Sequence, residues 1–290
     1  MIPVYDTAAL LADKRFHACL VFSADELLAT HGEIPRAVRY LSDLQKWLLS
    51  QAMLALHFEH RLDAARPPIS PTNLLRFLDG SPIASRNTAL AFLNEIRHYG
   101  LVEAFFSNDR RQRLFRALPH TEGLIARWYL THLRALDQID GADRAGRFAS
   151  QPDLIMRAQP KMARALLSSR EWCDPPSTIG LFTWAESGSN ILHDLASRVP
   201  WQLPAERVWI GSRTASAIAE RYHISPSHAA RILAQARNAG FVGWEAAGNR
   251  GDCWVSTTFV RDYRHWQALK FAAISVAFRE ALEVAPTPVG

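Results

Sequence analysis

Cysteine is scarce in the sequence, and this scarcity argues against two common kinds of stabilisation. Among 290 residues there are only three cysteines, Cys19, Cys173 and Cys253, which lie far apart and form no Cys-x-x-Cys motif. Disulfide frameworks and structural zinc sites both need cysteines at characteristic, mostly short spacings. We therefore expect neither, and a reducing cytoplasm is the compartment that fits this cysteine usage.

Long apolar runs are also missing. No stretch approaches the roughly 20 apolar residues that a membrane-spanning helix needs. The N-terminus lacks the basic segment and apolar run of a secretory signal. With 48% hydrophobic and 21% charged residues, the chain has enough apolar side chains for a packed core. We expect a soluble, cytoplasmic protein without a membrane partner.

No constellation of catalytic residues is visible in the sequence. It contains no phosphate-binding loop, no nucleophile elbow and no HExxH motif. His57 and Glu59 match the His-x-Glu of zinc deaminases, but the Pro-Cys-x-x-Cys partner is missing. His57 and His60 lie three residues apart on a predicted helix and lack a third metal ligand. We therefore predict that the protein is not an enzyme and binds no metal or cofactor.

Lysine is scarce as well, and nearly all of the basic residues are arginine. The 33 Lys and Arg residues exceed the 28 Asp and Glu residues, which gives a formal net charge of +5 and a sequence pI of about 9.4. A basic balance favours a polyanionic partner. An arginine-rich composition also arises from coding bias alone, so the positions of the arginines must decide whether nucleic acid is the partner.

Proline and glycine divide the chain into comparable halves, with strong breakers at Pro67-Pro68 and Pro175-Pro176. We predict a first domain over residues 1–140, a connecting segment over 141–176 with a helix around 160–169, and a second domain over 177–290. Apolar residues at helical spacing predict long helices over 36–62, 122–139 and 259–282. Short strands are expected at about residues 101–106, 113–118, 241–246 and 252–257.

An internal repeat relates two segments that lie 140 residues apart. Residues 85–102 align without a gap with residues 225–242. The identical pairs lie at the start, the core and the end of one predicted helix. They are Ser85 with Ser225, Ala89 with Ala229, Leu93 with Leu233, Arg97 with Arg237, Gly100 with Gly240, and Val102 with Val242. Because the offset is close to half the chain length, we predict two copies of one domain.

Each copy has the pattern of a helix-turn-helix followed by a hairpin. In the second copy, residues 214–222 form a short predicted helix with Thr214 or Ser212 as its cap. After a tight turn, Ser225 caps a second helix, which Gly240 ends. Asn-Asp in the first copy and Gly-Asn in the second favour a turn at the tip of the hairpin. The predicted fold is mostly α with small β wings, that is, tandem winged helix-turn-helix domains.

Three features between residues 85 and 123 are more specific. The predicted second helix ends in Gly-Leu-Val at residues 100–102, the hairpin tip has Asp-Arg-Arg at residues 109–111, and residues 118–123 approximate a Leu-Thr-x-x-Gly motif. Over about residues 36–138 the chain thus resembles the MarR (multiple antibiotic resistance) family of transcriptional regulators. It departs from the family at residues 118–121, where extra residues intervene, and at Ala91, where the family often has Arg. The second copy has Arg231 at that position but a less typical wing.

The resemblance implies an assembly and an effector. Family members are homodimers of subunits about half as long as this chain, so it implies a pseudo-dimeric arrangement of two copies in one polypeptide, either monomeric or paired further as a homodimer. It also implies a small-molecule effector near the junction of the dimer helices and the DNA-binding domains. Four tryptophans are candidates for lining such a pocket, with core packing as the more ordinary alternative: Trp172, Trp184, Trp201 and Trp209.

In winged helices the second helix enters the major groove, and the wing reaches phosphates or the minor groove. The predicted contacts of the first copy are Ser85, Arg86, Asn87 and Thr88 on the helix, and Arg110, Arg111 and Arg113 on the wing. Those of the second copy are Ser225, Ser227, His228 and Arg231 on the helix, and Asn249 and Arg250 on the wing. For any single residue, a solvated surface side chain is an equal alternative.

The arginines at positions 110, 111, 113 and 116 form a cluster opposed by a single carboxylate, Asp109. Like charges at a hairpin tip repel one another unless a polyanion binds, so the cluster favours nucleic acid. Because the two copies differ at the predicted contacts, the DNA site should be asymmetric. The second copy, with fewer charges on its wing, is expected to bind more weakly.

Sequence-specific binding of double-stranded DNA by a transcriptional regulator is the predicted function. Two alternatives stay open: a tandem winged-helix protein-interaction module, as in chromosome-segregation accessory proteins, and a plasmid replication initiator, which also has two winged helices. The basic wing argues against the first alternative. The wing motif favours the regulator over the initiator.

Overall fold

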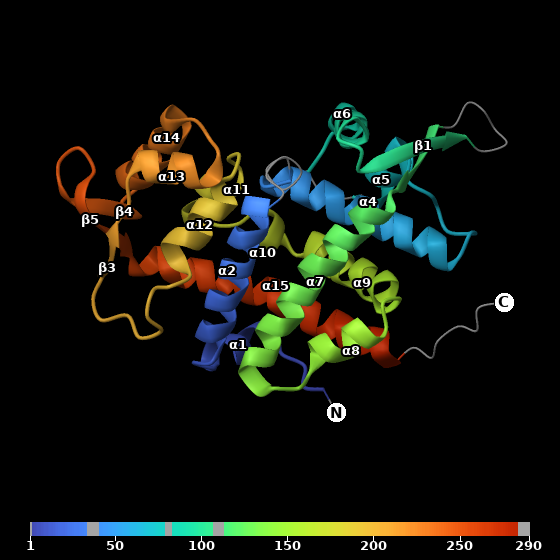
Figure 1. Cartoon of the computed structure of the whole chain (residues 1–290), viewed down its shortest axis with the longest axis horizontal. Coiled ribbons are helices and arrows are strands. Elements are labelled where there is room, and N and C mark those ends of the chain that lie inside the picture. Colours follow the sequence, from blue (N-terminus) through green and yellow to red (C-terminus); the bar gives the residue numbers. More distant parts are fainter. Residues whose placement is uncertain (1, 34–40, 79–82, 107–112, 284–290) are drawn as a thin grey trace. The chain divides into compact units, whose positions relative to one another are not determined.

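The computed structural model describes residues 2–33, 41–78, 83–106 and 113–283. The chain is mostly α-helical, with a two-stranded hairpin and a three-stranded antiparallel sheet (Figure 1). It forms two compact units. Unit 1 contains the residues up to Asp6, Gln45–Cys173 and the residues from Lys270 onward, and unit 2 contains Thr7–Leu44 and Asp174–Leu269.

These units interleave along the chain, whereas the predicted domains 1–140, 141–176 and 177–290 follow one another. Helix α2 (Phe16–Glu33), near the start of the chain, belongs to unit 2. The second half of α15 (Thr257–Glu283), near its end, belongs to unit 1. Such an exchange depends on long-range packing, which breakers along the sequence do not reveal.

Unit 1 is built from helices and one hairpin. The hairpin strands are β1 (Val102–Phe106) and β2 (Arg113–Ala117), paired from Val102 opposite Ala117 to Phe106 opposite Arg113. Ile69 forms an isolated antiparallel bridge to Phe115. The helices are α4 (Leu44–Leu62), α5 (Pro71–Phe77), α6 (Arg86–His98), α7 (Pro119–Asp140), α8 (Arg144–Ser150), α9 (Leu154–Ser168), α10 (Arg170–Cys173) and the second half of α15 (Thr257–Glu283).

Unit 2 contains the three-stranded sheet, in the order β3-β5-β4. Its strands are β3 (Arg207–Ser212), β4 (Val242–Ala246) and β5 (Arg250–Ser256). Val208, Val242 and Val255 are buried on its inner face. The helices are α1 (Thr7–Ala12), α2 (Phe16–Glu33), α11 (Ser177–Thr183), α12 (Gly188–Ala196), α13 (Ala215–Tyr222), α14 (Pro226–Asn238) and the first half of α15.

The 140-residue offset relates the buried stripes of α6 and α14. The stripe of α6 is Ala89, Phe92, Leu93 and Ile96, and the stripe of α14 is Ala229, Ile232, Leu233 and Ala236. Each stripe follows the i, i+3, i+4, i+7 spacing of a helix that buries one side. Both helices are followed by antiparallel strands, β1 and β2 in unit 1 and β4 and β5 in unit 2.

The two helices also begin and end in the same way. Ser85 Oγ accepts a hydrogen bond from the backbone N–H of Thr88 (3.2 Å), and Ser225 Oγ accepts one from that of His228 (3.1 Å), as N-caps do. At the other end, Gly100 and Gly240 have φ values of 69° and 76°. The N–H groups that follow these glycines bond back to Ile96 (2.8 Å) and Ala236 (2.9 Å), which completes a Schellman motif in each copy.

The structure corrects several predicted element boundaries. Strand β3 was not predicted, because its side chains alternate over only three residues before Gly211 and its partner β5 lies far along the chain. The last predicted strand starts at Arg250 and ends at Ser256, so Thr257 belongs to α15 instead. In the second copy, Thr214 rather than Ser212 caps α13.

Helix boundaries also differ from the prediction: the helix predicted over 122–139 is α7, Pro119–Asp140, and the one predicted over 259–282 is α15, Thr257–Glu283. The helix predicted around 160–169 is α9, which begins at Leu154 and contains Pro160 in its interior. Burial of its apolar side, including Leu154, Ala158 and Met162, outweighs the roughly 3 kcal/mol that an interior proline costs. Helix α4 begins at Leu44, after residues 41–43, which are not helical; residues 34–40 lie outside the described part of the chain. No helix within the described ranges is long and apolar enough to cross a bilayer.

Replacement of Gly240 tests the shared helix ending. No atom lies within 4 Å of the Cβ that Gly240→Ala would add, so the left-handed φ is the main cost. We expect Gly240→Ala to lower the free energy of unfolding by about 1 kcal/mol in urea titrations. The control is Gly123→Ala within α7, where the space is also open and φ is helical, and which should stabilise by about 0.5–1 kcal/mol. Equal effects of the two variants would contradict the proposed role of φ.

Candidate nucleic-acid interface

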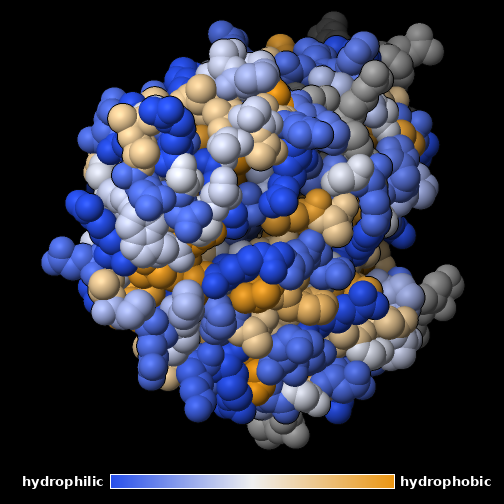
Figure 2. All heavy atoms as spheres, turned by 60° about the vertical axis from the view of Figure 1, so that its left-hand side comes forward, coloured by the Kyte–Doolittle hydropathy of each residue, from blue (hydrophilic) through white to orange (hydrophobic). Residues whose placement is uncertain are grey.

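Hydrophilic residues cover most of the face drawn in Figure 2, and hydrophobic residues show in patches between them. Polar and basic side chains are the ones that contact nucleic acid, so the candidate interface consists of such residues. The second helices of the two copies, α6 and α14, provide such side chains opposite their buried stripes. Neither helix has an acidic residue in its first turn.

Helix α14 presents a polar stripe to solvent. Ser227, Arg231 and Gln235 are exposed and lie one helical turn apart, so they share one side of the helix. The whole of α14 contains two arginines and no carboxylate. Of the residues predicted here to contact DNA, Ser227 and Arg231 are thus placed on one accessible surface. Gln235 extends this surface by a further turn.

His228 positions Arg231 instead of pointing freely into solvent. Its Nε2–H donates a hydrogen bond to the carbonyl oxygen of Glu186 in the loop before α12 (3.0 Å), and its Nδ1 accepts one from Arg231 Nη2 (2.8 Å). These two bonds define the neutral Nε2–H tautomer. The guanidinium keeps its other donors for a further partner.

The corresponding end of α6 is exposed but carries different chemistry. Arg86 and Asn87 are exposed, as predicted contacts must be. Thr88 is half-buried, and its hydroxyl is 2.9 Å from Ser85 Oγ, which already serves as the N-cap. Ser225 has the same capping role in α14. Ser85, Thr88 and Ser225 therefore have structural roles that explain their side chains without DNA.

The wing of the first copy is less positive than the sequence indicates. Arg113 is exposed, with its guanidinium carbon 5.7 Å from the centre of the Phe115 ring. Arg116 pairs with Glu103, which lies directly opposite on β1, at 2.6 Å. We expected Asp109 to be the single carboxylate near the four arginines. This is wrong for Arg116, because the register of the hairpin places Glu103 opposite it as a second carboxylate. Arg110 and Arg111 lie outside the described residues.

The wing of the second copy is joined to the end of α14. Asn249 has a left-handed φ of 58°, and its Oδ1 accepts a hydrogen bond from Arg237 Nη1 (2.7 Å). The Nε–H of Arg250 donates to the carbonyl oxygen of Ala247 (3.1 Å) across the turn. Asn249 therefore shapes the turn and ties it to α14. This role of Arg237 was not predicted, although its identity with Arg97 is part of the repeat.

The four tryptophans have different environments. Trp172 is buried in unit 1, with its ring 5.5 Å from that of Trp47, which agrees with core packing. Trp184 and Trp209, in unit 2, are 47% and 54% exposed. Trp201 lies edge-on to Phe16 and beneath the guanidinium of Arg264, 4.6 Å from the ring centre. Trp172 belongs to unit 1 and the other three to unit 2, and a small-molecule effector stays a prediction.

His57 and His60 both have protein partners. His57 Nε2 lies 2.8 Å from Glu122 Oε1, and Arg61 binds the other oxygen of the same carboxylate. His60 Nδ1 donates to the carbonyl oxygen of Arg66 (2.7 Å). Within the described ranges, no group of three or more His, Cys, Asp or Glu side chains is arranged to hold a metal ion. His57 borders a cavity of about 530 Å³ behind the hairpin of unit 1.

No protein-family model matches the chain, and neither curated proteins nor solved structures give a significant match. The features that bear on function are two similar helix–helix–hairpin segments with exposed polar helix faces. The second lies wholly within the described residues, and the first does so except for residues 79–82 and 107–112.

The environment of His57 predicts a pH dependence of stability. Burial lowers the pKa of His57 below its ordinary value of 6.5, and the hydrogen bond to Glu122 offsets this only in part. A histidine with a lowered pKa in the folded state favours folding above pH 6.5, and this contribution is lost as the pH falls towards the folded pKa.

We expect the free energy of unfolding of the wild type to fall more between pH 7.5 and 5.5 than that of His57→Gln, measured by urea unfolding at each pH. His17, whose pKa is also lowered by burial, is present in both proteins and cancels in the comparison. Parallel pH profiles for the two proteins would contradict this account.

Proposed function

We propose that the chain is a sequence-specific, double-stranded DNA-binding transcriptional regulator with two winged helix-turn-helix domains in tandem. The observation that supports this most strongly is the shared design at an offset of 140 residues: the same caps, buried stripe, Schellman ending and following hairpin. In winged helices this second helix enters the major groove. The resemblance of residues 36–138 to MarR regulators points in the same direction.

Arg231 is the side chain best suited to contact a base in the second copy. It lies on the exposed face of α14 within the first half of the helix, and His228 restricts its orientation. Arginine forms a bidentate pair with guanine in the major groove, and restricting the side chain beforehand reduces the entropy lost on binding. Ser227 and Gln235, one turn before and after it, supply neutral hydrogen-bonding groups.

The two copies would contact different base sequences. The positions in α6 equivalent to Ser227, Arg231 and Gln235 are Asn87, Ala91 and Glu95, all exposed. A carboxylate disfavours nearby phosphates, whereas Arg231 favours them. This contrast supports an asymmetric operator. It also favours tighter binding by α14 than by α6, the reverse of the order that the wings alone predicted.

A single chain would supply both DNA-binding domains. Each unit contains two successive helices followed by a pair of antiparallel strands, so one polypeptide would replace the two subunits of an ordinary dimeric regulator. This pseudo-dimeric arrangement predicts a complex of one chain per duplex, which sedimentation of the protein with its selected site can measure. Two chains per duplex would indicate the homodimeric alternative.

Replacement of Arg231 tests the proposed DNA contact. We expect Arg231→Ala to weaken binding to a selected duplex by about 1–3 kcal/mol, because one bidentate base contact is lost. Fluorescence anisotropy across about 50–200 mM salt measures both affinity and its salt dependence. The control is Arg147→Ala on α8, which removes the same charge from an exposed position outside both copies.

Three outcomes are informative. Loss of affinity in Arg231→Ala with little change in Arg147→Ala would support the proposal. Equal losses in the two variants would show that only net charge matters. Absence of duplex binding by the wild type at the lowest salt would contradict the proposal and favour the protein-interaction module.

A further inference from the structure

The outer face of the sheet in unit 2 presents aromatic side chains. Trp209 on β3 and Trp254 on β5 are directly paired in the antiparallel register, so their side chains lie on the same face. This is the face opposite the buried Val208 and Val255. Trp209 is 54% exposed, on an edge strand of the sheet.

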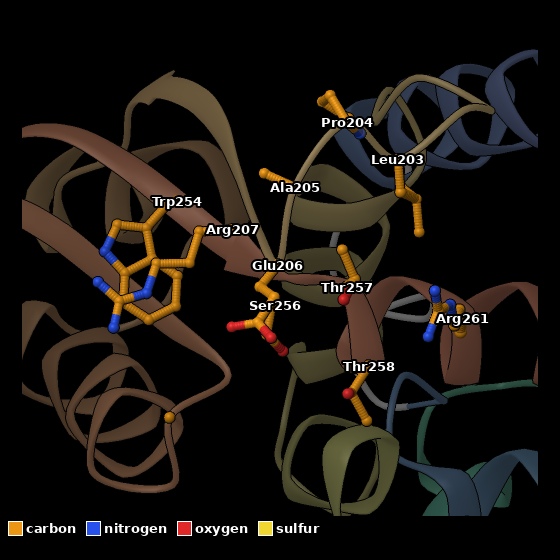
Figure 3. A pocket seen from close by; sticks show the side chains of 11 residues that line it. Leu203, Pro204, Ala205, Glu206, Arg207, Trp254, Ser256, Thr257, Thr258 and Arg261 are labelled. Atoms are coloured by element: carbon orange, nitrogen blue, oxygen red, sulfur yellow. The ribbon is translucent and has the colours of Figure 1, made fainter.

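Trp254 is held flat against the sheet. Gly243 lies opposite it on β4, and a Cβ at this glycine would collide with the indole ring. The guanidinium of Arg207 lies over the ring, 4.4 Å from its centre, as a cation–π contact. Figure 3 shows these two side chains stacked at one end of an open groove. Arg207 is exposed, so its charge stays available to solvent and to ligands.

The groove runs from this stack to the beginning of α15 and has a volume of about 700 Å³. Thr257, Thr258 and Arg261 border its other end, and Glu206 lies between the two ends (Figure 3). Each of the side chains that border it is exposed or half-buried. Pockets for small molecules enclose most of their ligand. An open groove of this kind is better suited to a chain that passes through it.

The charges of the groove favour an anionic ligand with hydrogen-bond donors. Arg207 and Arg261 outnumber Glu206, and the positive end of the α15 dipole adds to the arginines. Arg261 and the Thr258 hydroxyl suit phosphate oxygens. The Glu206 carboxylate accepts hydrogen bonds only, so it suits the amino or imino groups of unpaired bases. Trp209 does not border the groove, but it is paired with Trp254 at its end and adds an exposed surface on which such bases stack.

This groove is separate from the proposed duplex contacts. Gly240, which also borders it, follows the C-terminal end of α14. Ser227 and Arg231 lie towards the opposite end of that helix. At 1.5 Å per residue, Gly240 is about 20 Å along the helix axis from Ser227.

We propose that this face of unit 2 binds single-stranded DNA, with a base stacked on Trp209 and phosphates near Arg261 and Thr258. The proposal goes beyond duplex binding and uses different residues. Aromatic stacking surfaces beside arginines are the general means by which proteins hold unpaired strands without strict sequence preference.

The test uses the full chain and a labelled oligodeoxythymidylate of about 16 nucleotides, the upper end of the usual site size. Fluorescence anisotropy at about 50 mM salt measures its affinity. We expect Trp209→Ala to weaken binding about fivefold or more, and Trp209→Phe to restore part of the loss. The control is Trp184→Ala, which removes an equally exposed tryptophan of the same unit from outside the sheet and should leave the affinity unchanged.

A second variant makes the test independent of the tryptophan. Arg261→Ala should weaken strand binding. It should also reduce the slope of log affinity against log salt concentration by about the amount that one phosphate contact contributes. Trp209→Ala should leave duplex binding unchanged, and Arg231→Ala should leave strand binding unchanged, so each proposal can fail without the other. The inference is overturned if the strand does not bind, if Trp184→Ala has the same effect as Trp209→Ala, or if thymidine monophosphate competes as well as the strand.

Discussion

The arrangement of each proposed DNA-binding surface depends on the burial of one stripe of the second helix. In α14, Ala229, Ile232, Leu233 and Ala236 are buried, and each large apolar side chain of this kind contributes about 1.5–3 kcal/mol. Because a helix has 3.6 residues per turn, burial of these positions leaves Ser227, Arg231 and Gln235 facing solvent. The serine cap and the Schellman ending then limit the helix to the length that this stripe stabilises. The same constraint acts on α6, where the outward positions are occupied by different side chains.

Because the buried positions are separate from the exposed ones, the two copies of the repeat can share a core and still present different side chains to solvent. The buried positions keep their apolar character, whereas the exposed positions differ in charge between the copies, Arg231 against Ala91 and Gln235 against Glu95. Unit 2 adds features of its own. Its sheet has a third strand, β3, where the described part of unit 1 has a single bridge between Ile69 and Phe115. That strand carries Trp209 and Arg207, so the stacking part of the additional proposed site lies largely on a strand that unit 2 has beyond the hairpin.

Sequence predicted the parts that local physical chemistry determines. The cap at Ser225 and the helix end at Gly240 followed from residue type, and the structure confirms them. The parts that depend on distant partners were missed or misplaced. Strand β3 needs β5, and the interior Pro160 of α9 is tolerated because of tertiary burial. Among the candidate contacts, the neutralisation of Arg116 by Glu103 depends on hairpin register, and the bond of His228 to Glu186 joins elements 42 residues apart.

The central claim is that one chain contacts double-stranded DNA through two second helices with different exposed residues. Selection of duplexes from a random library, followed by hydroxyl-radical footprinting of the bound chain on the selected site, tests it most directly. The account predicts an enriched site with two protected segments of unlike sequence, one of which loses protection when the exposed face of α14 is altered and the other when that of α6 is altered. Failure to enrich any sequence, or protection that is indifferent to both helices, would contradict it.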